Sequence, residues 1–167
     1  MEQPPKHFGD AEEVSIRIAT ASDVPALVRL INAAFAVEGF VFDGERIGAE
    51  ETQKFMQSGK FLLAHDASRF VGCVYVEIRE VRGYLGLLAV DPSRQGKGFG
   101  RDLVYAAEEY FRAAGCRAVD LRIISPRIPL PIFYGRLGYL ETGTAPFSSA
   151  LKAKVLGHYI IMSKELE

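Results

Sequence analysis

The sequence predicts an α/β domain in which a mixed, mostly antiparallel sheet of about seven strands is flanked by about four helices. Three observations predict this fold class. The chain has 167 residues, which is the length of one domain. Hydrophobic residues make up 49% and charged residues 25%, as is typical of folded globular proteins. Strand-like and helical patterns follow one another in the order β-α-α-β-β-β-α-β-α-β-β.

The first half of the domain contains one strand, two helices and then three successive strands. Residues 14–19 alternate between apolar and polar side chains, which predicts the first strand. Residues 50–57 predict a short second helix. A polar turn joins strands at 60–64 and 69–78 into a hairpin, and a nearly all-apolar strand at 84–90 follows. The first helix is predicted from apolar residues at helical spacing: Leu27, Leu30, Ile31, Ala34 and Phe35.

The second half begins with a long helix, which starts near Phe99 and is ended by Gly115. Because a strand–helix–strand crossover is right-handed, the strands at 84–90 and 118–124 should run parallel to each other. The remaining expected elements are a strand at 118–124, a helix at 129–137, and strands at 139–144 and 158–163. Residues 13–167 are assigned to this single domain, and the polar residues 1–12 to a flexible N-terminal tail.

The composition excludes several classes of protein. With 20 basic and 21 acidic residues, the net charge of −1 provides no extended basic surface for nucleic acid. No apolar stretch approaches the ~20 residues that span a bilayer, and residues 1–10 lack the apolar core of a signal peptide. Cys73 and Cys116 lie in apolar runs without metal-site or disulfide spacing. We expect a cytoplasmic protein with no nucleic-acid, membrane or metal partner.

Chemistry is indicated by the segment between the apolar strand and the long helix. Residues 91–101 read Asp-Pro-Ser-Arg-Gln-Gly-Lys-Gly-Phe-Gly-Arg. Unpaired amides and the helix dipole at a helix start favour an anion, and glycines let the anion approach the backbone. Three basic side chains add local positive charge: Arg94, Lys97 and Arg101. The pattern predicts a phosphate or pyrophosphate site.

Two other phosphate motifs fit this segment poorly. A Walker loop requires Gly-Lys-Ser/Thr, which is absent from the chain. A dinucleotide-binding fingerprint requires a third glycine where Arg101 stands. Asp120, which has the spacing of a ribose-binding acid, lies inside its strand rather than at the strand end. A tight glycine turn that binds nothing is a further alternative.

Two motifs resemble those of the GNAT superfamily of N-acetyltransferases. The segment Gln-Gly-Lys-Gly-Phe-Gly at 95–100 matches the family signature Gln/Arg-x-x-Gly-x-Gly/Ala. The segment Phe-Tyr-Gly-Arg-Leu-Gly-Tyr at 133–139 resembles the second landmark, Phe/Leu-Tyr-x-x-x-Gly-Phe/Tyr. The motifs stand in the family order, with a helix and a strand between them. The resemblance covers about residues 14–165 and implies the GNAT fold with acetyl-CoA as co-substrate.

The resemblance implies how the co-substrate is bound. Main-chain amides of the signature loop (residues 95–101) would bind the CoA pyrophosphate, and the strand before it would pair with the pantetheine arm like an added strand. That strand and the strand at 118–124 would splay apart, leaving amides to polarise the thioester carbonyl. Ser125 occupies the region where many members have an Asn and is assigned to cofactor binding. The full set of assigned cofactor-binding residues is Leu88, Ala89, Val90, Gln95, Gly96, Lys97, Gly98, Phe99, Gly100, Arg101, Ser125 and Tyr134.

Catalytic roles also follow from the resemblance. Tyr134 matches the family's general acid, and a tyrosine pKa of ~10 against ~8.5 for a thiol keeps it protonated. Tyr84 and Arg122 stand where some members place a carboxylate base. Glu77, on the preceding strand, is therefore the first candidate base, and Glu38 is the second.

The expected function is acetyl-CoA-dependent N-acetylation of a primary amine on a small molecule or peptide, by direct attack without a covalent intermediate. The entrance loops (residues 36–48 and 144–157) would frame the acceptor site, with an apolar lining from Phe35, Phe40, Phe42 and Phe147. A non-catalytic sensor module that binds CoA or acetyl-CoA is the alternative from another class, and an NAD-binding oxidoreductase is a third. The resemblance also makes a homodimer an expected assembly.

Overall fold

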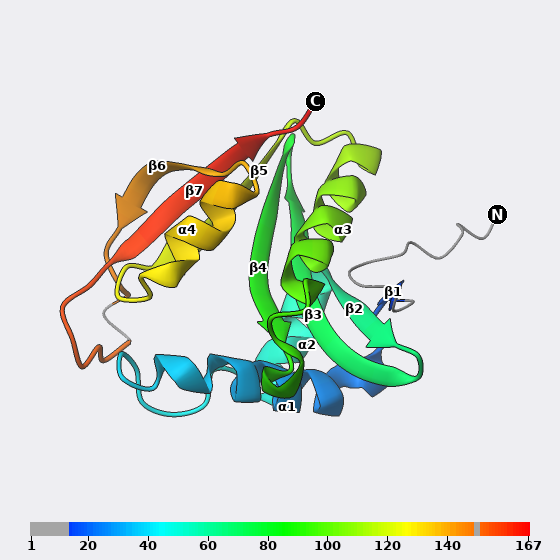
Figure 1. The fold of residues 1–167 in the computed structure, drawn as a ribbon, viewed down its shortest axis with the longest axis horizontal. Helices are drawn as coiled ribbons and strands as arrows, with labels where there is room; N and C mark the ends of the chain where they lie inside the picture. Colours follow the sequence, from blue (N-terminus) through cyan, green and yellow to red (C-terminus); the bar gives the residue numbers. More distant parts are fainter. Residues whose placement is uncertain (1–13, 149–150) are drawn as a thin grey trace.

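A seven-stranded mixed sheet forms the centre of the described part of the chain (Figure 1). The computed structural model describes residues 14–148 and 151–167, so the expected tail at 1–12 lies outside the described residues. The strand order is β1-β2-β3-β4-β5-β7-β6, and only β4 and β5 pair in parallel. The strands are β1 (Val14–Ile18), β2 (Lys60–Asp66), β3 (Arg69–Arg79), β4 (Arg82–Val90), β5 (Ala118–Ile124), β6 (Leu140–Ala145) and β7 (Tyr159–Glu165).

Helices cover both faces of this sheet and create two apolar cores (Figure 1). Because side chains alternate along a strand, Phe61 and Leu63 of β2 pack toward α1, whereas Leu62 and Ala64 pack toward α3. The helices are α1 (Val24–Phe35), α2 (Ala49–Ser58), α3 (Phe99–Ala113) and α4 (Pro129–Arg136), with short 3-10 turns η1 (Ala21–Asp23), η2 (Ala36–Glu38) and η3 (Pro92–Arg94). None of the helices in the described ranges is long and apolar enough to cross a membrane.

The predicted fold class is confirmed, and the differences lie at element ends. β3 and β4 are longer than predicted and are separated only by Glu80 and Val81. Glu80 adopts a φ of +58°, which closes a tighter turn than the sequence suggested. Gly115, with a φ of +85°, follows the end of α3 as predicted, and the amide of Cys116 bonds back to the carbonyl of Phe111 at 2.9 Å.

The two parallel strands diverge after a short paired segment. β4 and β5 pair only from Arg82↔Ala118 to Tyr84↔Asp120. Between Gly86 and Ala89, β4 carries one residue more than the facing segment of β3, and Leu87 there has a φ of +48°. Such a bulge bends its strand and increases the local twist. The remainder of β4 therefore separates from β5, which is the splayed arrangement that the family resemblance implies.

Candidate active site

The signature loop joins β4 to α3 through a tight turn. Asp91 begins the turn, because its Oδ1 accepts hydrogen bonds from the amide and the hydroxyl of Ser93, at 2.9 and 2.8 Å. Gly96 and Gly98 have φ values of +81° and +89°, in the left-handed region that other residues rarely adopt. Gly98 is also the residue that precedes α3. The glycines thus have a conformational role at the point where the chain reverses into the helix.

The amides of the signature loop are not used by the protein itself. Among the described residues, none accepts a hydrogen bond from the backbone amides between Gln95 and Arg101. These amides lie at the start of a helix of 15 residues, where the dipole adds partial positive charge. The loop therefore presents a row of unpaired donors suited to an anion such as a diphosphate.

Side-chain contacts hold the signature loop in place. Arg94 forms an ion pair with Asp66 at the end of β2, and its guanidinium lies 5.6 Å from the centre of the Phe99 ring. The sequence suggested that Arg94 adds positive charge to the phosphate site. In the structure it instead anchors the loop to the sheet. Gln95 donates a hydrogen bond to the carbonyl of Val90 at 3.3 Å. The sequence did not indicate this role of Asp66, because no residue near it in the chain marks it as a partner of the loop.

Tyr134 lies on α4, on the same side of the sheet as α3. Its side chain is only 6% exposed and packs edge-on against Phe133 and Tyr139, with ring centres 4.9 and 5.9 Å apart. Its hydroxyl makes no hydrogen bond with any residue in the described part of the chain. Burial raises the pKa of Tyr134 above its ordinary value, and the charge of Arg127 opposes part of that rise. The hydroxyl is thus protonated and available as a donor.

The two candidate bases have different surroundings. Glu77 forms an ion pair with Arg79 and accepts a hydrogen bond of 2.8 Å from the hydroxyl of Tyr75. Burial opposes ionisation of Glu77, but the hydrogen bonds from Arg79 and Tyr75 outweigh it, so its pKa is lowered. These are the contacts of a carboxylate held in its ionised form and already occupied by two donors.

Glu38 lies at the end of η2, in the first entrance loop, and its side chain is 13% exposed. Burial raises its pKa above the ordinary value, and the charges of Arg127 and Arg46 oppose part of that rise. A guanidinium nitrogen of Arg127 lies 3.9 Å from a Glu38 carboxylate oxygen. Arg127 lies between the end of β5 and the start of α4, so the Glu38 carboxylate lies at this end of the sheet.

The two entrance loops contact each other across this end of the molecule. Phe42 and Ala153 form an isolated β-bridge, and the amide of Lys154 bonds to the carbonyl of Val41 at 2.7 Å. Phe42 also contacts Phe147, with ring centres 5.1 Å apart. The other two phenylalanines differ: Phe35 packs against the core beneath α1, and Phe40 is 49% exposed. The loops thus contact each other, with two of the four aromatic residues at their junction, and their role in framing the acceptor site stays a prediction.

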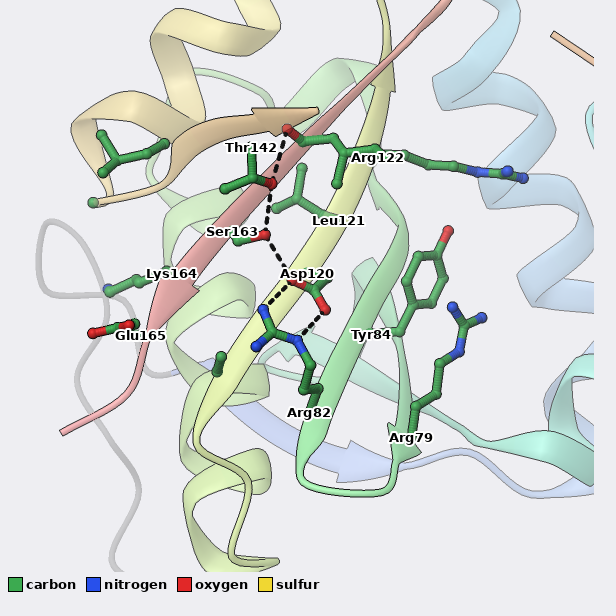
Figure 2. A pocket seen from close by; sticks show the side chains of 14 residues that line it. Arg79, Arg82, Tyr84, Asp120, Leu121, Arg122, Thr142, Ser163, Lys164 and Glu165 are labelled. Carbon is green, nitrogen blue, oxygen red and sulfur yellow. Dashed lines mark hydrogen bonds and ion pairs between the residues drawn. The ribbon is translucent and has the colours of Figure 1, made fainter. Parts of the chain in front are cut away.

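A cavity of about 840 Å³ lies beside the paired part of β4 and β5 (Figure 2). Asp120 occupies its centre, where it binds the guanidinium of Arg82 at 2.7 Å and the hydroxyl of Ser163 at 2.6 Å. The hydrogen bond from Arg82 lowers the pKa of Asp120. Asp120 is therefore a paired structural carboxylate, which removes the ribose-binding acid that the dinucleotide alternative required. The sequence analysis did not predict this cavity, although the polar residues Asp120 and Arg122 at alternate positions of β5 could have indicated a polar surface here.

Ser125 and the two cysteines have structural contacts. The Ser125 hydroxyl accepts a hydrogen bond of 3.0 Å from the amide of His158, and its own amide bonds to the His158 carbonyl at 2.8 Å. Ser125 thus connects the end of β5 to the start of β7, and its assignment to cofactor binding stays a prediction. Cys73 and Cys116 are buried, and burial raises the pKa of both thiols. Neither thiol has the surroundings of a nucleophile.

The comparisons with known proteins agree with this arrangement. A profile of the acetyltransferase (GNAT) family matches residues 26–139. A mycothiol acetyltransferase from Saccharopolyspora erythraea is 30% identical over 136 residues, a match that covers 78% of this chain and 45% of the relative. The chain thus spans less than half the length of the curated relatives it matches.

Two solved structures have the same fold. An N-acetyltransferase from Thermoplasma acidophilum, solved in complex with coenzyme A, has a TM-score of 0.76 at 18% identity, over 92% of this chain and 99% of that one. The ribosomal-protein-S18-alanine N-acetyltransferase from Escherichia coli has a TM-score of 0.73 at 15% identity, over 92% and 94% of the two chains. At such low identity the likeness shows a shared fold.

Proposed function

Because the chain belongs to the GNAT acetyltransferase family, we propose that it is an acetyl-CoA-dependent N-acetyltransferase. The acceptor is a primary amine of a small molecule or peptide, which attacks the thioester directly in a ternary complex. The observation that carries this proposal is the row of unpaired amides in the signature loop, at the start of α3 and beside the gap between β4 and β5. The buried thiols of Cys73 and Cys116 favour transfer without a covalent enzyme intermediate.

In this proposal, the chain binds acetyl-CoA through its backbone. The amides of residues 95–101 hold the diphosphate, and the edge of β4 at Leu88, Ala89 and Val90, with which β5 does not pair, holds the pantetheine arm as it would hold a strand. The left-handed conformations of Gly96 and Gly98 suit this role, because a glycine has no side chain of its own to cover the loop amides. Bound acetyl-CoA supplies the activated acetyl group. Holding amine and thioester together contributes roughly 7–11 kcal/mol of the rate enhancement.

Tyr134 is the proposed general acid. Its buried, protonated hydroxyl donates a proton to the sulfur that leaves as the thioester breaks. A group that is unpartnered in the protein loses no internal hydrogen bond when it turns to that sulfur. A positioned acid of this kind typically contributes ~10²- to 10⁴-fold to the rate.

Glu38 is the proposed general base, in preference to Glu77. A base must be unprotonated before it accepts a proton and must have a pKa high enough to hold one. Burial shifts the pKa of Glu38 in the required direction, whereas Arg79 and Tyr75 hold Glu77 in its ionised form. Glu38 also lies beside Arg127, in the turn that leads from β5 into α4, the helix that carries Tyr134.

The proposal is tested by measuring free CoA thiol released from acetyl-CoA in the presence of a panel of primary amines. We expect thiol release that depends on both the amine and the protein, and an N-acetylated product of matching mass. A thermal-shift comparison of acetyl-CoA, CoA and NADH runs in parallel, because ligand at 100 times Kd stabilises the fold by about 2.7 kcal/mol. Stabilisation by CoA without thiol release from any amine would instead support the sensor module. Stabilisation by NADH alone would contradict both.

A further inference from the structure

We propose that the acceptor amine carries an oxyanion, a carboxylate or a phosphate, and that Arg122 binds it. This inference rests on the proposed function and names the substrate class of the same site. Arg122 lies on β5, two residues beyond Asp120, the last residue of β5 that pairs with β4. It therefore stands at the position where the gap between the two strands opens.

The side chain of Arg122 points away from the polar network of the cavity. Figure 2 shows Asp120 engaged with Arg82 and Ser163 on one side, while the Arg122 guanidinium extends past Tyr84 in the other direction, toward the helix beyond the gap. Arg122 is exposed, and the cavity that it lines is continuous with that network. The guanidinium is therefore accessible to a molecule that occupies this cavity.

Of the four basic residues that line this cavity, Arg122 is the one without an ion-pair partner among the described residues. Arg79 is paired with Glu77, Arg82 with Asp120, and Lys164 with Glu108. No carboxylate in the described ranges lies within ion-pair distance of Arg122. Glu165, the acidic residue of the lining without such a pair, stands opposite Ala118 at the other end of β5. The cavity is thus positive at the gap and negative at its far end.

One aromatic contact orients the Arg122 guanidinium. It lies 4.3 Å from the centre of the Tyr159 ring, and that ring contacts Phe147 at 5.0 Å. Phe147 in turn contacts Phe42 of the other entrance loop. Stacking on an aromatic face leaves the planar fork of arginine free to bind a carboxylate or phosphate with two parallel hydrogen bonds. An arginine that is stacked, exposed and unpaired is arranged to bind a ligand rather than to stabilise the fold.

The consequence for specificity is a preference among amines. An acceptor that carries an oxyanion neutralises Arg122 and gains charge-assisted hydrogen bonds, whereas a polyamine or a lysine-rich peptide meets an uncompensated positive charge. The favoured class includes amino acids, acidic peptides and amines that carry a phosphate ester.

The test compares matched acceptors in the thiol-release assay. Each amino acid is paired with its carboxamide, and each phosphorylated amino alcohol with its parent amino alcohol, so that one member of each pair carries the oxyanion and the other does not; rates are compared at equal concentrations of the unprotonated amine. For the wild-type chain, we expect kcat/KM to be about 10- to 100-fold higher for the anionic member, the range of a hydrogen bond to a charged group. The carboxylate and phosphate arms identify which oxyanion is bound. Arg122→Gln should remove the preference by lowering kcat/KM for the anionic members alone, and Arg122→Lys should restore part of it.

Controls separate this inference from the proposed function. Arg29→Gln removes an exposed arginine of α1 outside the cavity and should leave both members of every pair unchanged. Binding of an N-acetylated amino acid to the CoA-loaded protein, measured by calorimetry, should weaken in Arg122→Gln and not in Arg29→Gln. Equal rates for the members of each pair, or a preference that survives Arg122→Gln, would overturn the inference and leave the proposed function intact. Absence of thiol release with every amine would overturn the proposed function, and the assignment of the acceptor with it.

Discussion

Replacing Tyr134 with phenylalanine should separate catalysis from stability. The Tyr134 side chain is buried, and its hydroxyl makes no hydrogen bond with a described residue, so removing the oxygen breaks no hydrogen bond of the fold. Phenylalanine keeps the buried ring in place, and the free energy of unfolding of Tyr134→Phe should therefore stay constant or rise. The same oxygen is the proposed proton donor. Its loss should lower kcat by ~10²- to 10⁴-fold, which is about 3–5 kcal/mol of transition-state stabilisation.

Tyr139 provides the matched control. Its ring contacts that of Tyr134, but its hydroxyl donates a hydrogen bond of 3.1 Å to Glu108, a carboxylate that is only 1% exposed. Tyr139→Phe should therefore lower the free energy of unfolding by about 1.5–3 kcal/mol, which corresponds to a Tm lower by about 3–12 °C. Its kcat should remain close to that of the wild type. The same chemical change should therefore lower kcat at Tyr134 and lower stability at Tyr139.

Three measurements decide the outcome. Thiol release gives kcat, calorimetry gives the Kd of acetyl-CoA, and thermal unfolding gives Tm for both variants. For Tyr134→Phe we expect an unchanged Kd, an unchanged or higher Tm and a large loss of kcat. A kcat for Tyr134→Phe within about threefold of the wild type would refute the acid assignment, because a positioned proton donor contributes far more than that. A clear fall in its Tm would show instead that the hydroxyl has a structural partner.

Two further predictions follow from the same site. Because a base must be unprotonated, kcat/KM should fall as the pH falls through the raised pKa of Glu38, at a pH above the ordinary glutamate value of about 4.3. In pH–rate profiles, Glu38→Gln should abolish this fall in kcat/KM at low pH, and Glu77→Gln should leave it in place. Arg127→Gln should move the fall to higher pH, because the positive charge that it removes had lowered the pKa of Glu38. An unchanged fall in Glu38→Gln would contradict the assignment of the base. Gly98→Ala should lower stability by about 1–2 kcal/mol and weaken CoA binding in calorimetry, because it strains a φ of +89° and places a methyl group 3.0 Å from the guanidinium of Arg101, which must then move at the signature loop. Gly44→Ala imposes similar strain at a φ of +86° in open space, so it should lower Tm alone; equal CoA affinity in the two variants would argue against the signature loop as the binding site.

The order and type of the elements were predictable because they depend on local periodicity. The alternation of apolar residues in β2 and the apolar stripe of α3 are properties of short segments, and the tertiary structure preserves them. The turn between β3 and β4 was predicted less well, since the left-handed conformation of Glu80 has no signature in its residue type. The bulge at Leu87 was equally invisible in an apolar run.

The candidate site divides in the same way. The signature loop was found from glycines and a helix start, which are adjacent in the chain. The partner of Arg94 was not, because Asp66 belongs to the end of another strand. The choice between Glu77 and Glu38 was also beyond the sequence, since it depends on which carboxylate is paired and which is buried.

The sequence by itself determined the alternation of strands and helices and the position of an anion-binding turn, because dihedral preferences and hydrophobic periodicity act over a few residues. Only the tertiary structure decided where the parallel strands separate, which charges compensate one another and which remain uncompensated. Those properties depend on distances between segments remote in the chain, and both the pKa of Glu38 and the unpaired charge of Arg122 arise from such distances.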